Sequence, residues 1–163
     1  MKVKTLLEGK PFMTEYGIVG YSTVVLIACD DEKNILYDCG SKGCALQLKE
    51  ALEKAGMKPE DITHVVISHL HFDHVGNLPL FSDAEILLNK IEWESANQTP
   101  DEWHSIQTLA YLEKRGNLRF VKEGDIISEE VSVMELPGHT PGLIGLRCGA
   151  ETILCSDAMK NRY

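Results

Sequence analysis

The chain has 163 residues, 44% of them apolar and 25% charged, which are the proportions of an ordinary globular protein. These values exclude a disordered or fibrous chain, and the length predicts a single domain over 1–163. The formal net charge of −9 disfavours extended nucleic-acid binding, because that binding draws most of its affinity from Lys and Arg.

The sequence shows no sign of a membrane segment or of oxidising surroundings. No apolar run approaches the ~18 residues of a membrane span, and the start MKVKTLLEGKPF lacks the apolar core of a signal peptide. The five cysteines include no C-x-x-C pair and are typical of reduced thiols. We therefore expect a cytoplasmic protein with no membrane contact.

Extended segments and one clear helix make up the first half of the chain. Runs of β-branched and apolar residues predict strands at 2–7, 18–29, 35–40, 63–68 and 85–89. Apolar residues recur at helical spacing from Ala45 to Ala55, and Gly56 follows as a stop signal. The order strand, helix, strand around this segment predicts a βαβ unit, preceded by an antiparallel meander.

The second half begins with a second helix. Thr99 and Glu102 form the pattern of a capping box with Pro100 at the first helical position, which predicts a helix to about Lys114. His104 would then lie on the surface of that helix. Short strands are predicted after it at 118–121, 125–128, 131–136, 143–148 and 151–155. Strands and helices in both halves predict a layered α/β sandwich.

The segment SHLHFDHVGN follows the predicted buried strand at 63–68 and carries His69, His71, Asp73 and His74. In extended backbone, His69 and His71 point the same way with Cα atoms ~7 Å apart, which suits two imidazoles on one metal ion. The chain must turn soon afterwards, so Asp73 and His74 can face a second position. Nitrogen and carboxylate ligands without thiolate favour Zn²⁺, with Mn²⁺ and iron as alternatives.

Three further residues stand at strand ends. His139 lies between two Pro-Gly pairs in PGHTPG, Asp157 follows the apolar run TILC, and Asp38 ends ILYD. Taken alone, each is an ordinary turn or cap residue. The carboxyl ends of strands are nevertheless where α/β sheets bind their ligands.

The order HLHFDH, then PGHTPG, then SDA resembles the metallo-β-lactamase superfamily, and the resemblance extends from the early strands to Asp157. It implies an αββα sandwich with the site at one edge. It also implies two metal ions, one held by His69, His71 and His139, the other by Asp73 and His74, with Asp157 as a bridge. Asp38 would support a ligand histidine, although it could equally cap a turn.

The resemblance implies a hydrolase in which the metal ions activate a water for attack on a carbonyl or phosphoryl centre, with Asp73 orienting the water and receiving its proton. The expected substrate is a small molecule, an ester, lactone, thioester or phosphodiester. The alternatives are a phosphodiesterase or ribonuclease of the same fold and a non-catalytic metal-binding or interaction domain.

The sequence also departs from the family pattern. No histidine follows His139, and the chain stops at Tyr163, so a seventh ligand and a C-terminal strand and helix are expected to be missing. The chain would then be a fragment, share its site with another subunit, or hold the second metal weakly. An uncovered sheet edge predicts a homo-oligomer. Leu143 stands where many relatives have a polar residue, and DHVGNLPLF is similar to a small subgroup of the family.

Overall fold

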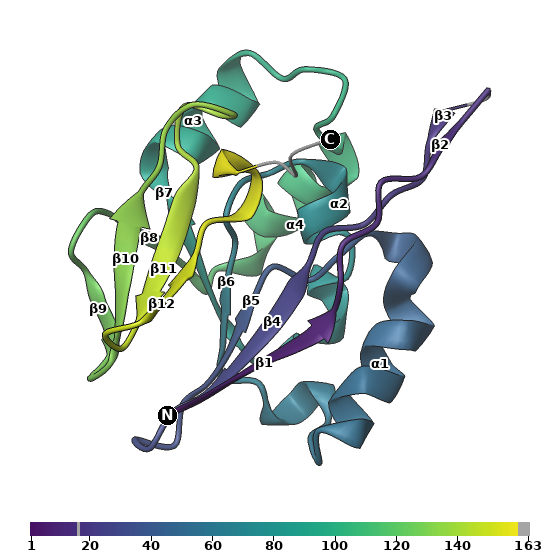
Figure 1. Ribbon diagram of the computed structural model, residues 1–163. Helices are drawn as coiled ribbons and strands as arrows, with labels where there is room; N and C mark the ends of the chain where they lie inside the picture. The colour runs from purple at the N-terminus through teal and green to yellow at the C-terminus, as the bar shows by residue number, and fades with distance from the viewer. Residues whose placement is uncertain (16, 160–163) are drawn as a thin grey trace.

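Two β-sheets face each other, and helices cover the outer face of the larger sheet (Figure 1). The computed structural model describes residues 1–15 and 17–159. Its strands are β1 (Lys2–Leu7), β2 (Met13–Thr14), β3 (Gly17–Ile18), β4 (Val24–Ala28), β5 (Asn34–Tyr37), β6 (His64–Val66), β7 (Glu85–Asn89), β8 (Leu118–Val121), β9 (Ile126–Ser128), β10 (Val131–Glu135), β11 (Ile144–Cys148) and β12 (Thr152–Leu154). Its α-helices are α1 (Ala45–Lys54), α2 (Phe72–Val75), α3 (Lys90–Gln98) and α4 (Ile106–Arg115).

The larger sheet has six strands in the order β1-β4-β5-β6-β7-β8. The pairs β1–β4 and β4–β5 are antiparallel, as the predicted meander requires, and β5 to β8 are parallel. The predicted βαβ unit is β5-α1-β6, in which Leu36 pairs with Val65. Because β6 is a central parallel strand, its carboxyl end opens at the sheet edge where a ligand site is expected.

The smaller sheet is antiparallel, with the strand order β12-β11-β10-β9. Its central pair is β10–β11, in which Val133 lies opposite Leu146. The loop that joins β10 to β11 carries PGHTPG, and it reaches the same edge of the molecule as the end of β6 (Figure 1).

Two apolar layers hold these elements together. One lies between the helices and the larger sheet and includes Leu48 and Leu52 of α1 and Leu112 of α4. The other lies between the sheets, where Ile35 and Ile144 are both fully buried. The mixed α/β sandwich is thus confirmed, with helices on one outer face. Within the described residues, the buried apolar side chains of the α-helices all belong to the first layer.

The prediction of one helix over 99–114 is wrong. The helix α3 ends at Gln98, and the hydroxyl of Thr99 donates to the carbonyl of Ser95 instead of capping a new helix. The helix α4 begins only at Ile106, where the Ser105 hydroxyl accepts the Thr108 N–H at 3.3 Å. Thr99 therefore completes a helix that the sequence pattern did not reveal.

The predicted strand over 18–29 is also divided. Ile18 ends the short hairpin β2–β3, which projects away from the sheets, and the strand β4 starts only at Val24 (Figure 1). None of the helices in the described ranges is long and apolar enough to cross a membrane. Tyr163, on which the expectation of a shortened chain rests, lies outside the described residues.

Candidate metal centre

Four of the predicted ligands come from the segment that follows β6. The backbone of His71 is extended, with φ −69° and ψ 148°, and α2 starts at the next residue. His69 and His71 therefore stand on extended chain, whereas Asp73 and His74 lie on the first turn of a short helix. This change of conformation sends the two pairs of side chains to neighbouring positions, as the motif spacing predicts.

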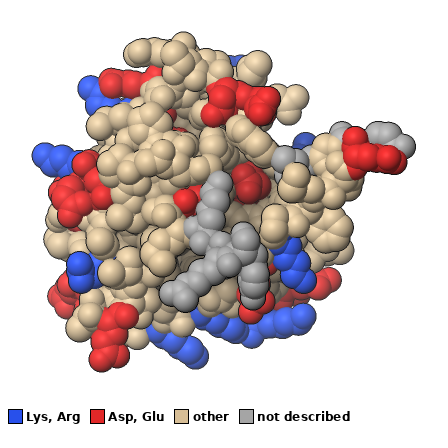
Figure 2. All heavy atoms as spheres, turned by 45° about the horizontal axis from the view of Figure 1, so that its top comes forward, with Lys and Arg blue, Asp and Glu red and all other residues tan. Residues whose placement is uncertain are grey.

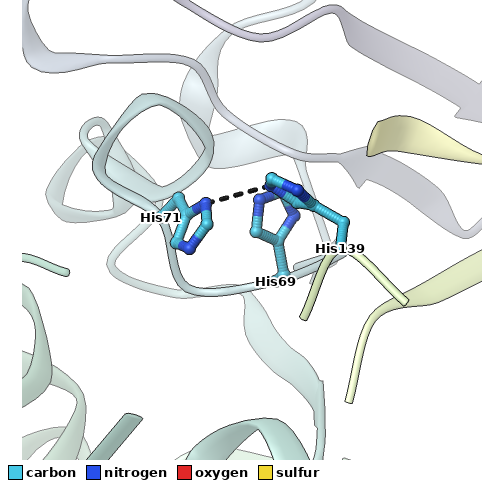
Figure 3. Close-up of side chains that lie close together, drawn as sticks. All are labelled: His69, His71 and His139. Atoms are coloured by element: carbon cyan, nitrogen blue, oxygen red, sulfur yellow. Dashed lines mark hydrogen bonds between the residues drawn. The ribbon is translucent and has the colours of Figure 1, made fainter. Parts of the chain in front are cut away.

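The imidazoles of His69, His71 and His139 converge (Figure 3), and each offers a ligand atom within 4.8 Å of the other two. His139 Nε2 lies 3.1 Å from His71 Nδ1, although the two residues come from different sheets. His69 is fully buried, and its Nε2 has no hydrogen-bond partner among the described residues. A buried orphan nitrogen facing two other imidazoles is the arrangement that a tetrahedral N-ligated metal ion fits.

A second group of close ligand atoms comprises His69, His74 and Asp157. Asp157 Oδ1 is 3.7 Å from His74 Nε2, and its Oδ2 is 3.4 Å from His139 Nε2. One carboxylate thus reaches towards both groups. Asp73 lies beside the second group, with its Oδ2 3.7 Å from His74 Nε2.

Asp38 holds the far side of this second group. It is 1% exposed, and its Oδ2 lies 2.8 Å from His74 Nδ1. Its Oδ1 accepts the backbone N–H of Ser68 at 2.8 Å, and its Oδ2 accepts the Ser68 hydroxyl. With Nδ1 of His74 occupied by the carboxylate, Nε2 is the nitrogen that faces Asp157 and Asp73.

Burial sets the protonation of these groups. It lowers the pKa of His69 far below its ordinary value and that of His71 to about 4, in both cases with neighbouring imidazoles acting in the same direction. Burial also lowers the pKa of His74, but the carboxylates of Asp38, Asp73 and Asp157 together outweigh it and the net shift is upward. The pKa of Asp73 is raised, chiefly by burial. At neutral pH, His69 and His71 are therefore neutral and able to bind a cation.

Sequence reasoning missed a second layer of residues around the histidines. Asp101 Oδ2 lies 3.5 Å from His71 Nε2, and Asp101 Oδ1 lies 2.8 Å from His104 Nδ1. The prediction that His104 is a surface residue is wrong, because its side chain is only 7% exposed. The loop before α4 folds back on the histidine segment, where His71 and His104 form a β-bridge. No spacing in the sequence could have indicated this tertiary contact.

Leu143 is also accounted for by its place in the fold. It is fully buried, and its carbonyl accepts the Leu136 N–H at 2.9 Å, which closes the loop that carries His139. The apolar residue at this position therefore belongs to the core.

A family model described as the metallo-beta-lactamase superfamily matches residues 17–156. Metallo-beta-lactamase domain-containing protein 1 of Xenopus laevis is 33% identical over 112 residues, covering 69% of this chain and 42% of that protein. An N-acyl homoserine lactonase of Bacillus cereus is 37% identical over 92 residues, covering 56% of this chain and 34% of that protein. The chain thus spans less than half the length of these curated relatives.

A crystal structure of a protein from Thermotoga maritima described as a metallo-beta-lactamase superposes with a TM-score of 0.80 at 23% identity. The superposition covers 93% of this chain and 73% of the other. At this identity the likeness supports the fold alone.

Proposed function

Since this chain belongs to the metallo-beta-lactamase superfamily, we propose that it is a metal-dependent hydrolase acting on small esters or lactones. The observation that carries this proposal is the convergence of His69, His71 and His139, with Asp157 reaching both this group and His74. Four imidazoles and a carboxylate gathered at the edge between two sheets are costly to bury without a ligand.

We assign the residues to two neighbouring cation positions. His69, His71 and His139 would hold one metal ion, and His74 with Asp73 the other, with Asp157 between them. Nitrogen and carboxylate donors suit Zn²⁺, with Mn²⁺ or iron as alternatives. Metal ions bound there would supply Lewis acidity and lower the pKa of a water at the site.

Asp73 is the proposed proton acceptor. Burial raises the pKa of its carboxyl group, and a carboxylate of higher pKa is a stronger base. It stands on the first turn of α2, whose backbone is fixed by the bond from the Ser22 N–H to the Asp73 carbonyl at 3.0 Å. The side chain is thereby positioned beside Asp157 to take a proton from an attacking water.

The proposed substrate class is supported by the surface charge of the chain and by its curated relatives. The curated relatives include an N-acyl homoserine lactonase, which supports a lactone or another activated carboxylic ester. Acidic side chains are spread over the face drawn in Figure 2, and basic ones lie mostly at its edges. That surface favours a small molecule over an extended polyanion. Thioester and phosphodiester cleavage, and a metal-binding domain without activity, are the alternatives to test.

The test measures metal content and activity together. We expect the purified chain to contain up to two equivalents of zinc, measured by elemental analysis, and to hydrolyse simple lactones and aryl esters. Asp157→Ala should lose at least one equivalent of zinc.

Asp73→Asn should lower kcat by ~10²- to 10⁴-fold, which is the usual contribution of a positioned general base. Tightly bound zinc without turnover would instead favour the non-catalytic alternative, and activity on bis-aryl phosphates alone would favour the phosphodiesterase.

His64→Gln is the matched control. His64 lies at the opposite end of β6, where its Nε2 is 3.6 Å from Glu85 Oε2, so its replacement should alter neither metal content nor turnover. A loss of zinc in this variant would contradict the assignment. The single domain over 1–163, the cytoplasmic location and the homo-oligomer stay predictions.

A further inference from the structure

A buried glutamate connects the two loops that supply the first group of histidines. Glu92 lies in the first turn of α3 and is 1% exposed. Its Oε1 accepts the Leu70 N–H at 2.9 Å, and its Oε2 accepts the Gly142 N–H at 3.2 Å. Leu70 stands between His69 and His71, and Gly142 belongs to the loop of His139. Each oxygen therefore holds one ligand loop.

The cost of burying this carboxylate indicates that the contact is specific. A buried charge is retained only where hydrogen bonds or an opposite charge compensate for lost hydration. No ion pair to Glu92 occurs among the described residues, so compensation comes from the two backbone N–H groups and from the N-terminal end of α3. An amide or apolar residue would pack here at lower cost but could not accept from both loops.

Close backbone packing between α3 and the loop of His139 is a second, independent indication that α3 positions this loop. A Cβ atom on Gly142 would lie 2.1 Å from the backbone nitrogen of Glu92 and 2.6 Å from its Cα. The loop of His139 thus rests directly on α3, and only glycine permits that approach. On the other side of His69, the Ile144 N–H donates to the Ser68 carbonyl at 3.0 Å. The segment with His69 is therefore tied to the β10–β11 connection both before and after the histidine.

We propose that Glu92 is a positioning residue for the metal centre, which sets the separation of the His69–His71 segment from the His139 loop. This inference rests on the proposed metal site. Ligand atoms need placement within about 0.5 Å, and these atoms come from two different sheets. By bridging Leu70 and Gly142, Glu92 fixes that placement without touching the metal.

The test compares zinc affinity in Glu92→Gln and in the unchanged chain by competition with a chromophoric chelator. The glutamine side chain has one acceptor oxygen and presents N–H groups to the other loop. We expect zinc affinity to fall ~10- to 100-fold, the usual effect of residues that orient ligands. The visible absorption of Co²⁺ bound in place of zinc should also change in shape, because it reports the coordination geometry.

Arg115→Met is the control for a general loss of stability. Arg115 donates to the backbone carbonyls of Ser82 and Ala84, remote from the histidines, so its loss should lower the melting temperature and leave zinc affinity and the Co²⁺ spectrum unchanged. Glu92→Asp keeps the charge but is too short to hold both loops, and we expect an intermediate loss of affinity. If Glu92→Gln does not fold, the measurement on Glu92→Asp tests the proposal instead.

The possible failures are distinguishable. If the unchanged chain binds zinc and both Glu92 variants bind it as tightly with the same Co²⁺ spectrum, Glu92 has no positioning role. If the unchanged chain binds no metal, the proposed function itself fails.

Discussion

The imidazole of His71 lies between two environments. Its Nδ1 faces His139 in the first group, and its Nε2 faces the carboxylate of Asp101. When Nδ1 is a ligand, the remaining ring proton is on Nε2, which has no hydrogen-bond partner among the described residues and lies 3.5 Å from Asp101 Oδ2. The negative charge of this carboxylate favours the tautomer with its proton on Nε2. The metal-free protein keeps the ring neutral because burial disfavours the charged form.

This burial predicts a pH dependence of stability in the metal-free protein. The pKa of His71 is about 4 in the folded chain, against an ordinary value of 6.5. As the pH falls below 6.5, His71 becomes protonated in the unfolded chain, whereas in the folded chain it is protonated only near pH 4. The contribution of His71 to the free energy of unfolding should therefore decrease over this window, by about 3 kcal/mol at about 1.4 kcal/mol per pKa unit. Urea unfolding in the presence of a chelator, from pH 7 to pH 4, measures it.

The control for this prediction is His71→Asn, which removes the titrating group. Its loss of stability between pH 6.5 and pH 4 should be smaller than that of the unchanged chain. Equal slopes in the two proteins would show that His71 does not titrate in this way. His74 acts in the opposite sense, because its raised pKa gives stability that is lost as the pH rises.

At the scale of elements, a tertiary contact overrides the local sequence pattern in the region between α3 and α4. The Thr99-x-x-Glu102 pattern is a genuine capping signal, yet the backbone uses Thr99 to end α3. The loop after it packs on the histidine segment, with the Phe72 N–H donating to the Trp103 carbonyl at 2.8 Å. This contact forms only in the folded protein, and it requires the chain before Ser105 to be non-helical.

Two matched substitutions test this assignment of helix ends. Ser105→Ala removes the hydroxyl that accepts the Thr108 N–H, and should cost about 1 kcal/mol of the free energy of unfolding. Thr99→Ala removes only a bond from an exposed hydroxyl to the Ser95 carbonyl, and should cost less than about 0.5 kcal/mol. Denaturant unfolding of both variants measures the difference. A larger loss of unfolding free energy in Thr99→Ala than in Ser105→Ala would contradict this assignment and support the predicted helix over 99–114.

What the sequence could predict follows from the range of the contacts involved. The strand β6, the helix α1 and the histidine motif are encoded in short windows of apolar spacing and residue type, and the structure has them where they were expected. The helix α3 was missed because its residues KIEWESANQ are mostly polar. Glu92 and Asp101 were missed for a different reason, since their partners are distant in the sequence and no spacing relates them.

At the scale of the whole molecule, the candidate centre lies across the boundary between the two sheets. His69, His71 and His74 follow β6 of the larger sheet, whereas His139 and Asp157 follow strands of the smaller one. The Tyr37 hydroxyl donates to the Ile144 carbonyl at 2.8 Å and joins the sheets directly beneath these groups. A metal ion held from both sides would therefore act as a further link between the layers.

Metal binding should accordingly stabilise the molecule as a whole. A ligand that binds only the folded state adds about 2.7 kcal/mol at a free concentration ~100 times its Kd. We expect zinc to raise the melting temperature and to slow hydrogen exchange most at the Ile144 N–H and in the loop 136–143, because this loop carries His139 and leads directly into β11. In Asp157→Ala the protection should shrink, since one of the carboxylates that joins the layers is gone. If zinc protected only the segment after β6, both metal positions would belong to one sheet, and the layers would be joined only by the apolar core and by hydrogen bonds such as that from Tyr37 to Ile144.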